Sequence, residues 1–499
     1  MPIAVETFIL DPRYQGTLQR QLQEIVTGGI LAGRFRPGDK LPSSRGLARH
    51  LGISRITVTL AYTELVANDY VSARGRSGYF VSDTAPRPPA LAATDHTATE
   101  GQVDWSRAIG QRFPTGPVLN RPQDWRRYRF PFIYGQTDPR LFDHQNWRKC
   151  ALQALGARDF ETLTADSYGR DDPALVEQII RLILPRRGIV AAPDEVLVTM
   201  GAQNALWMVA QILLTQRRTA VMEYPCYPAL REILYQSRCN TLSVPVDSLG
   251  LDPDRVPAET DVLFVTPSHH CPTSVTMPTT RRRALLEQAD RGDFLIVEDD
   301  YEFELSFAAP PSPALKSLDR SGRVIYVGSF AKSLFPGLRL GYIVAPAPLI
   351  REARTLRSLV VRHVPGHIQR AASYFLAQGH YDAQVHKMSR AYRDRRHITE
   401  TALREHGMPV AGSNCGGGSS FWMATPPGVR ADELARRLRQ RQVLIEPAGP
   451  FFDPGDDPGT HYRLAYSSID RAEIPEGIRR IAEECAAMTA DGHTPGHGA

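Results

Sequence analysis

The sequence predicts two folded domains, an N-terminal winged helix-turn-helix and a large α/β domain with a mostly parallel sheet. Three observations predict this: a length of 499 residues, a helix–break–helix pattern before residue 83, and alternating strand-like and helical runs after residue 129. A chain this long exceeds one hydrophobic core. We place the first domain at residues 8–83, a flexible linker at 84–128, the large domain at 129–488 and a disordered tail at 489–499.

Composition and charge narrow the class of protein. Hydrophobic residues make up 42% of the chain and charged residues 23%, as in ordinary globular proteins. The net charge is +5, and basic residues between Arg34 and Arg76 outnumber acidic ones by that same amount. The six cysteines are scattered without metal-ligand spacing, and no apolar run is long enough to span a membrane. We expect a reduced, cytoplasmic protein without a metal site.

The first domain opens with an amphipathic helix. Leu18, Leu22, Ile25 and Val26 fall on one helical stripe. Two glycines, Gly28 and Gly29, follow this stripe, and we expect the helix to end there.

A helix-turn-helix and a wing follow in the sequence. Ser43 is suited to cap a helix that Gly52 ends, and Ser54 begins a second helix that continues to about Asn68. So short a break between two helices is typical of a helix-turn-helix. Residues 70–81 surround a basic, glycine-containing tip, which predicts a hairpin wing.

The second helix of such a motif enters the major groove of DNA with its first turn. We therefore predict that Ser54, Arg55 and Thr57 face the bases, since arginine can bind O6 and N7 of guanine together. Three further basic residues are expected to contact phosphates and to add affinity rather than sequence choice: Arg45, Arg74 and Arg76. A small helical domain with a solvated basic surface is the alternative.

The large domain alternates strand-like and helical runs, which indicates parallel strands joined by helices. The strand candidates are residues 195–199, 219–222, 262–266, 294–297 and 324–327. After the last of them, Lys332 stands between the hydroxyl of Ser329 and the cation of Arg339. Such a lysine can form an imine with pyridoxal phosphate while its neighbours bind the phosphate. A surface lysine without this role is the alternative.

Further residues supply what that cofactor needs. Ala202 and Gln203 open a helix after a strand, so their backbone amides can cradle a phosphate. Tyr227 offers a ring to stack on the pyridine, although it could be a core tyrosine. Asp299 offers a carboxylate to the pyridine nitrogen, with Tyr301 as donor to the phenolic oxygen, although an acidic run is more often a solvated turn.

Arg463 lies inside an apolar strand-like run, Tyr462–Tyr466, and a buried arginine needs an anionic partner. Its planar fork suits the carboxylate or sulfonate of a ligand. A structural ion pair is the alternative. We predict that Arg463 binds an effector.

Motifs in both domains carry a family resemblance. The strings Leu41–Arg45, Ser54–Val58 and Gly75–Gly78 resemble winged helices of the GntR family. Residues 129–488 resemble fold-type I aminotransferases, and the whole chain resembles the MocR/GabR-type transcriptional regulators. That resemblance implies pyridoxal phosphate on Lys332, operator DNA as a partner and a domain-swapped homodimer. It also implies an amino compound as effector, which displaces the lysine as an external aldimine.

One motif departs from the enzymes of this fold. They usually carry Asn-Pro-Thr-Gly, whose asparagine binds the phenolic oxygen of the cofactor, whereas this chain has Cys271-Pro272-Thr273-Ser274. Cysteine is a poor donor, so Tyr301 or His270 is expected to take that role. The loss favours sensing over turnover.

The resemblance therefore implies a regulator that senses a small amine and controls genes for its metabolism. A catalytically active aminotransferase with an accessory DNA-binding domain is the alternative, and a DNA-binding protein that has lost its cofactor is disfavoured by the intact cofactor residues. The opening residues 5–11 and the run through Val71 are similar to the taurine-responsive branch. Taurine is the favoured effector, and ectoine-derived amines are the alternative.

Overall fold

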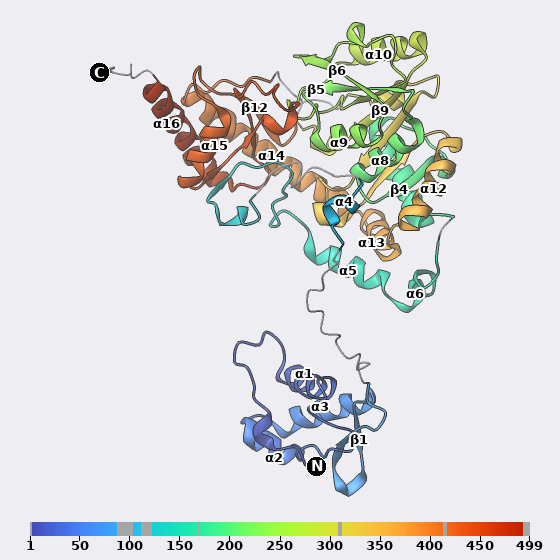
Figure 1. Cartoon of the computed structure of the whole chain (residues 1–499), viewed down its shortest axis with the longest axis vertical. Coiled ribbons are helices and arrows are strands. Elements are labelled where there is room, and N and C mark those ends of the chain that lie inside the picture. Colours follow the sequence, from blue (N-terminus) through green and yellow to red (C-terminus); the bar gives the residue numbers. More distant parts are fainter. Residues whose placement is uncertain are drawn as a thin grey trace. The chain divides into compact units, whose positions relative to one another are not determined.

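The computed structural model describes residues 2–86, 103–110, 122–167, 169–307, 312–412 and 417–492. The chain divides into two compact units, Met1–Arg112 and Phe113–Ala499, which are described separately (Figure 1). Across the described ranges, no helix combines the length and the apolar character that crossing a membrane requires.

The first unit packs α1 (Leu18–Leu31), α2 (Ser44–Leu51) and α3 (Arg55–Ala67) around one apolar core. The hairpin of β1 (Val71–Ala73) and β2 (Tyr79–Val81) completes it, with antiparallel pairing and a 3-10 turn at Gly75–Ser77. The predicted helix-turn-helix and wing are confirmed.

Local capping explains the boundaries of the two helices. The Ser43 hydroxyl accepts a hydrogen bond from the amide of Gly46, and the Ser54 hydroxyl accepts one from the amide of Ile56. Each bond satisfies an amide that has no partner inside its helix. Gly52 ends α2 with a φ of 66°, in the left-handed region that glycine adopts without a steric penalty.

The predicted end of the first helix at Gly28 and Gly29 is wrong, because α1 continues to Leu31. Packing against Phe35 accounts for the glycine: a Cβ on Gly29 would lie 2.3 Å from that ring. A Cβ on Gly28 would meet no described atom within 4 Å. Gly29 therefore lets the Phe35 ring pack against the helix, and it does not end the helix.

The predicted linker and tail are only partly irregular. Inside residues 84–128, Asp104 caps the short helix α4 (Trp105–Ala108), and Trp125–Arg127 form a 3-10 turn. Residues 87–102 and 111–121 lie outside the described residues. Helix α16 (Ile474–Gly492) includes the first four residues of the predicted tail, and residues 493–499 lie outside the described residues.

The second unit is built on an eight-stranded sheet with the order β4-β11-β10-β9-β8-β5-β6-β7. Its strands are β4 (Val196–Thr199), β5 (Thr219–Tyr224), β6 (Asn240–Asp247), β7 (Gly250–Leu251), β8 (Val262–Val265), β9 (Leu295–Asp300), β10 (Val324–Ser329) and β11 (Gly341–Val344). β11 and β7 pair antiparallel with their neighbours, and the other pairs are parallel. All five predicted strands are present, so the mostly parallel α/β sheet is confirmed.

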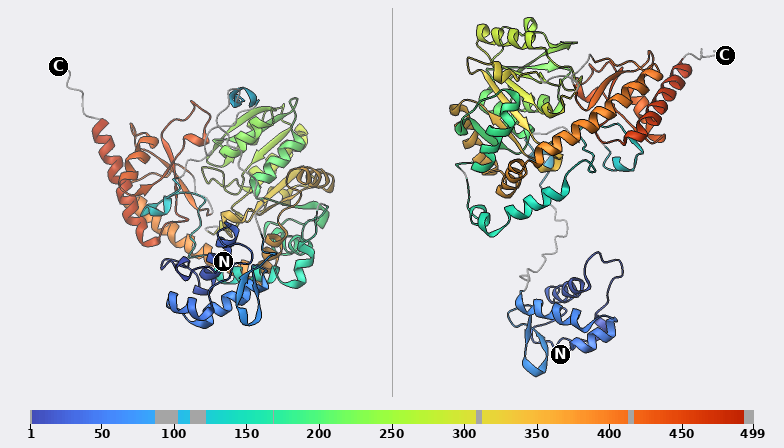
Figure 2. Two further views of the ribbon diagram at one scale, coloured as in Figure 1. Left: turned by 60° about the horizontal axis from the view of Figure 1, so that its bottom comes forward. Right: turned by 180° about the vertical axis from the view of Figure 1, so that it is seen from behind.

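Helices lie on both faces of this sheet (Figures 1 and 2). Alternate strand residues point to opposite faces. Phe264 and Val297 pack with α8 (Ala202–Leu213) on one face, whereas Leu263 and Ile296 pack with α10 (Thr279–Gly292) on the other. Further helices of this part are α5 (His144–Ala154), α6 (Ala157–Leu163), α7 (Pro173–Gln178), α9 (Pro228–Gln236), α11 (Leu315–Leu318), α12 (Ala347–Val361) and α13 (Gly366–Ala377).

A smaller layer holds the C-terminal part of the unit. It consists of the antiparallel sheet β12-β15-β14 together with α14, α15 and α16. The bounds are β12 (Ser420–Ala424), β14 (Glu446–Pro447), β15 (His461–Ala465), α14 (His380–Glu405) and α15 (Ala431–Gln440).

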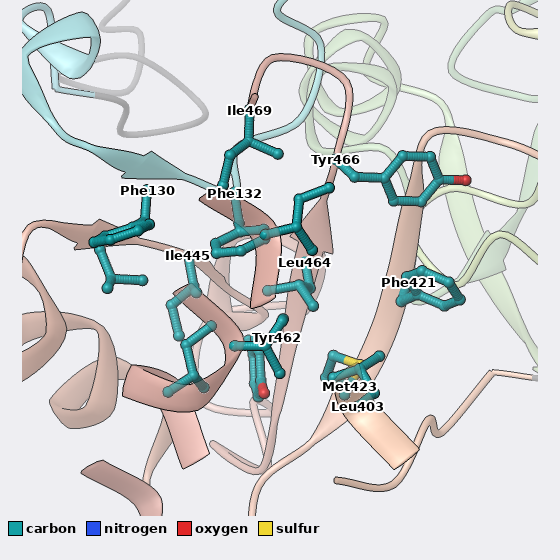
Figure 3. Packing of buried hydrophobic residues seen from close by; sticks show 14 of the residues in the cluster. Phe130, Phe132, Leu403, Phe421, Met423, Ile445, Tyr462, Leu464, Tyr466 and Ile469 are labelled. Atoms are coloured by element: carbon teal, nitrogen blue, oxygen red, sulfur yellow. The ribbon is translucent and has the colours of Figure 1, made fainter. Parts of the chain in front are cut away.

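The start of the second unit packs into this C-terminal layer. β3 (Phe130–Pro131) pairs parallel with β13 (Val443–Leu444). Figure 3 shows Phe130 and Phe132 in the apolar core that also contains Ile445, Tyr462 and Leu464. The residues that follow β3 are thus anchored beside β14 and β15.

The two glycines of α1 should respond in opposite ways to alanine. Gly28→Ala should stabilise α1 by about 0.5–1 kcal/mol, because alanine loses less backbone entropy in a helix than glycine does. Gly29→Ala should destabilise it by about 1–3 kcal/mol, because the new methyl group overlaps Phe35. Hydrogen–deuterium exchange of the α1 amides in the full-length protein measures both changes. Equal effects of the two substitutions would contradict the packing account.

Candidate functional site

A cavity of about 250 Å³ lies at the carboxyl ends of the central strands of the large sheet. Apart from His270, the alternative for the phenolic oxygen, it is lined by the residues that the sequence predicted for cofactor or effector binding: Ala202, Gln203, Tyr227, Asp299, Tyr301, Ser329, Lys332, Arg339 and Arg463. Parallel pairing explains part of this convergence, because Asp299 and Ser329 end neighbouring strands at the same edge of the sheet. The fold therefore brings into one cavity residues that are far apart in the chain.

One wall of the cavity is suited to an anion. Gly201, with a φ of 84°, precedes α8, so the first amides of that helix, beginning at Ala202, are available to a ligand. The Arg339 Nη2 donates to the carbonyl of Met200 at 3.1 Å, which holds its guanidinium beside this helix start. Ser329 adds a hydroxyl at the end of β10. Amides, a hydroxyl and a guanidinium together match the donors that a phosphate group requires.

Asp299 is a buried carboxylate with unused hydrogen-bonding capacity. Its Oδ1 has no hydrogen-bond partner among the described residues. Burial, reinforced by the charge of Asp300, raises the pKa of Asp299 to about 7, although the positive charge of Lys332 opposes this shift. A buried acceptor of this kind is costly unless a donor meets it. A protonated ring nitrogen in the cavity would supply that donor, so the site fits a pyridine cofactor.

Asp300, the next residue of the strand, forms a buried ion pair with Arg187. Its Oδ2 accepts hydrogen bonds from Arg187 Nε at 2.6 Å and from the Tyr326 hydroxyl at 2.8 Å. Burial alone would raise the pKa of Asp300, but the Arg187 charge and hydrogen bonds that include one from Ser268 outweigh it and lower the pKa. Successive residues of a strand face opposite sides, and only Asp299 lines the cavity.

The region expected to bind the phenolic oxygen differs from the prediction in one respect. His270 is not among the described residues that line the cavity; its Nδ1 lies 2.7 Å from the Thr273 hydroxyl, and burial lowers its pKa to about 3. Of the two candidates for the phenolic oxygen, Tyr301 and His270, the cavity lining therefore favours Tyr301. Tyr301 does line the cavity, and its hydroxyl donates to the His269 carbonyl at 2.8 Å. Burial raises the pKa of the Cys271 thiol to about 11, so it stays neutral.

Arg463 combines the two alternatives that its sequence context left open. Its Nε donates to Glu446 Oε2 at 2.9 Å, which is a buried structural ion pair. Its Nη2, however, has no hydrogen-bond partner among the described residues, and the side chain lines the cavity. The ion pair anchors the guanidinium while leaving one amino group for an anion inside the cavity.

Tyr134 is a site residue that the sequence analysis missed. The Lys332 Nζ lies 3.9 Å from the centre of the Tyr134 ring, and the Arg463 guanidinium carbon also lies 3.9 Å from it. The only local signal is an apolar run after residue 129, which is typical of a core segment. No spacing in the sequence connects that run to residues two to three hundred positions later.

The residues predicted for DNA binding lie in the first unit. Arg55 and Thr57 belong to the first turn of α3, and the Ser54 hydroxyl caps this helix. Arg55 Nε also donates to the Ser44 hydroxyl at 3.4 Å. Exposed positions on α2 and the hairpin hold the other predicted residues: Arg45, Arg74 and Arg76.

Two contacts of this surface were not predicted. Arg74 pairs with Asp83 at 3.3 Å and lies over the Phe80 ring, so the protein partly neutralises and orients it. Ile56 and Leu60, one turn apart on α3, are 70% and 50% exposed. Together with Arg55, they give the start of this helix a surface that is both cationic and apolar.

Family models match both parts of the chain. The model for bacterial regulatory proteins of the gntR family matches residues 18–81. The model for aminotransferase class I and II matches residues 135–481. The matched ranges coincide with the winged helix and with the unit that contains the cavity.

Two regulators match nearly the whole chain, and a solved aminotransferase structure matches most of it. The HTH-type transcriptional regulator TauR of Rhodobacter capsulatus is 57% identical over 482 residues, which cover 97% of this chain and 99% of that protein. The probable rhizopine catabolism regulatory protein MocR of Rhizobium meliloti is 30% identical over 491 residues, covering 98% and 97%. The structure of the α-aminoadipate aminotransferase LysN from Thermus thermophilus, complexed with N-(5'-phosphopyridoxyl)-L-leucine, has a TM-score of 0.68 at 28% identity, covering 78% of this chain and 100% of its own. The chain therefore belongs to the MocR-type transcriptional regulators, in which a GntR winged helix precedes an aminotransferase-like domain.

The adjacent aspartates should respond differently to removal of their charge in the cofactor-free protein. Because the pKa of Asp299 is raised to about 7, its contribution to stability is present at low pH and is lost as the pH rises through that value. The free energy of unfolding of Asp299→Asn, relative to that of the wild type, should therefore rise by about 2–3 kcal/mol between pH 5 and pH 8. Urea unfolding at the two pH values measures it.

Asp300→Asn is the matched control. It removes the partner of the buried Arg187 and should destabilise the protein at both pH values, by about 3 kcal/mol or more. A stability difference between Asp299→Asn and the wild type that does not change with pH would contradict the raised pKa of Asp299.

Proposed function

We propose that this MocR-type regulator holds pyridoxal phosphate on Lys332, binds a small amine in the same cavity, and thereby changes how its winged helix binds operator DNA. One observation carries the cofactor assignment: the cavity combines a lysine, an unsatisfied buried carboxylate at Asp299 and an anion-binding helix start. The assignment rests on all three features together, because any two of them could also occur in a site without pyridoxal phosphate.

Each residue that the sequence predicted for the cavity has a role in this proposal. The amides at Ala202 and Gln203 bind the phosphate, together with Ser329 and Arg339. Three further side chains hold the ring: Tyr227 stacks on it, Asp299 binds its nitrogen and Tyr301 donates to its phenolic oxygen. The cofactor, when bound, supplies an aldehyde carbon that condenses with primary amines. The relative LysN, with its phosphopyridoxyl ligand, supports this assignment.

We propose taurine as the effector, because it joins a primary amine to an anion. The amine approaches the position of Lys332, and the sulfonate binds the unpartnered Nη2 of Arg463. A full-length relative with 57% identity, the regulator TauR, supports this choice of branch. Ectoine-derived amines with a carboxylate present the same two groups and are the competing ligands in a test.

On the DNA side, the proposal assigns base contacts to the first turn of α3. Arg55 and Thr57 read bases in the major groove, with Ser54 at the entrance of the helix. Phosphate contacts come from α2 and the hairpin, through Arg45, Arg74 and Arg76. We propose that the protein acts as a domain-swapped homodimer, as the family resemblance implies, so that two winged helices meet two half-sites.

Sensing is favoured over turnover by the surroundings of the phenolic oxygen. The Tyr301 hydroxyl donates to the His269 carbonyl and has to turn from it in order to donate to the phenolic oxygen, and Cys271 stands where the enzymes usually have asparagine. The full-length relatives are also regulators. We therefore propose that slow transamination, if it accompanies binding, is secondary to the control of DNA binding.

Lys332→Ala tests the proposal. The wild type, reduced with borohydride and digested, should carry the cofactor mass on the peptide that contains Lys332, and taurine should shift its visible absorbance. The variant should lose the covalent attachment, the taurine-dependent shift and the taurine-dependent change in DNA affinity. Its affinity for DNA without effector should stay within about twofold, because that surface belongs to the other unit.

Lys149→Ala, at an exposed lysine of α5, is the control and should behave as the wild type. Unchanged cofactor attachment and taurine response in Lys332→Ala would overturn the proposal. Complete conversion of the bound cofactor to the amine form, reversed by a keto acid, would instead favour the aminotransferase.

A further inference from the structure

The ring of Tyr134 contacts two cationic side chains of the cavity. Lys332 Nζ and the Arg463 guanidinium carbon each lie 3.9 Å from the ring centre, within the range of cation–π attraction. In the proposed function these two residues mark the two ends of the effector, its amine and its anion. Tyr134 therefore lies beside the segment of the effector that joins them.

The position of Tyr134 is fixed by its own backbone. Its amide donates to Glu446 Oε2 at 3.2 Å, and that same oxygen accepts the hydrogen bond from Arg463 Nε. The preceding residues are anchored in the core of the C-terminal layer, where Phe132 is fully buried (Figure 3). Tyr134 itself is only 6% exposed. The backbone of Tyr134 is thus anchored, and its ring forms part of the buried wall of the cavity.

The anion-binding end is equally fixed. The Arg463 guanidinium lies between two rings, with the centre of Phe451 at 4.7 Å and that of Tyr134 at 3.9 Å. The ion pair with Glu446 holds it from a third direction. Arg463 is therefore unable to retreat in order to accept a longer ligand without breaking buried contacts.

The size of the cavity sets the scale of what can fit. The effector has to share this cavity with the cofactor, so the chain that joins its two ends lies close to the cavity wall. Because the Tyr134 ring touches both cations, additional methylene groups between the amine and the anion of the effector would press against it. Forcing atoms into occupied space is destabilising, and a single methylene in a tight pocket changes discrimination by about 10–200-fold.

We propose that Tyr134 determines effector specificity by limiting the length of the chain between the amine and the anion. The site accepts two carbons between these groups and rejects four, because the ring blocks the path of the longer chain. This inference rests on the proposed function and adds the residue that selects among amines of the same chemistry.

The test uses the full-length protein loaded with pyridoxal phosphate and a homologous series of ω-amino sulfonates with two, three and four carbons. Calorimetry and the visible absorbance give the dissociation constant of each. The wild type should prefer the two-carbon compound. In Tyr134→Ala, the preference for two over four carbons should fall by about tenfold or more, because removal of the ring opens that space.

Two further variants separate the ring from other effects. Tyr134→Phe keeps the ring, removes the hydroxyl and should retain the wild-type order, with affinities within about twofold. Tyr134→Leu keeps an apolar side chain of smaller reach and should show an intermediate shift of about threefold or more. Tyr134→Leu replaces Tyr134→Ala in the test if the alanine variant does not bind the cofactor. The visible absorbance per protein chain measures how much cofactor each variant binds.

The outcomes separate this inference from the proposed function. A wild type that binds none of the amines would overturn the proposed function itself. A wild type that responds to taurine, with Tyr134→Ala and Tyr134→Leu ranking the three compounds as the wild type does, would overturn only the role of Tyr134. A loss of length preference in Tyr134→Phe would also contradict it, because the ring would still be present.

Discussion

The parallel pairing of β9 with β10 is the constraint on which the site depends. Its register sets Asp299 opposite Val327 and Asp300 opposite Gly328, so the acidic residues lie beside the strand that leads to Lys332. Close packing maintains this arrangement, since a Cβ on Gly328 would lie 2.2 Å from the Tyr342 ring. The sheet therefore determines which functional groups meet, and the loops at its edge supply them.

The charged groups at this edge of the sheet are of two kinds: some are paired within the protein, and others face the cavity with an unused hydrogen-bonding atom. Asp300 is paired with Arg187 away from the cavity, whereas Asp299 lines the cavity and has a buried oxygen without a partner among the described residues. The same division recurs at Arg463, where Glu446 holds Nε and leaves Nη2 unpaired. Unsatisfied buried groups cost stability, and here they point into one cavity where a ligand can satisfy them.

Local patterns predicted much of this molecule. Helix caps such as Ser43, the five strands and the residues around Lys332 were recognisable because each rests on neighbours in sequence. The errors arose where a packing contact, rather than the local sequence pattern, decides the structure. Gly29 stays helical because Phe35 packs on it, and Tyr134 enters the site through Glu446, 312 positions later. Neither contact has a periodicity that a sequence reveals.

The central claim is that ligand binding in the cavity and DNA binding are coupled. The most direct test is whether DNA changes the affinity for the ligand by the same factor as the ligand changes the affinity for DNA. Taurine is titrated into the cofactor-loaded protein saturated either with an operator selected from random DNA or with unrelated DNA of equal length. The account predicts taurine dissociation constants that differ by about fivefold or more, with taurine changing the operator preference by the same factor. Identical taurine affinity on both DNAs would contradict the coupling.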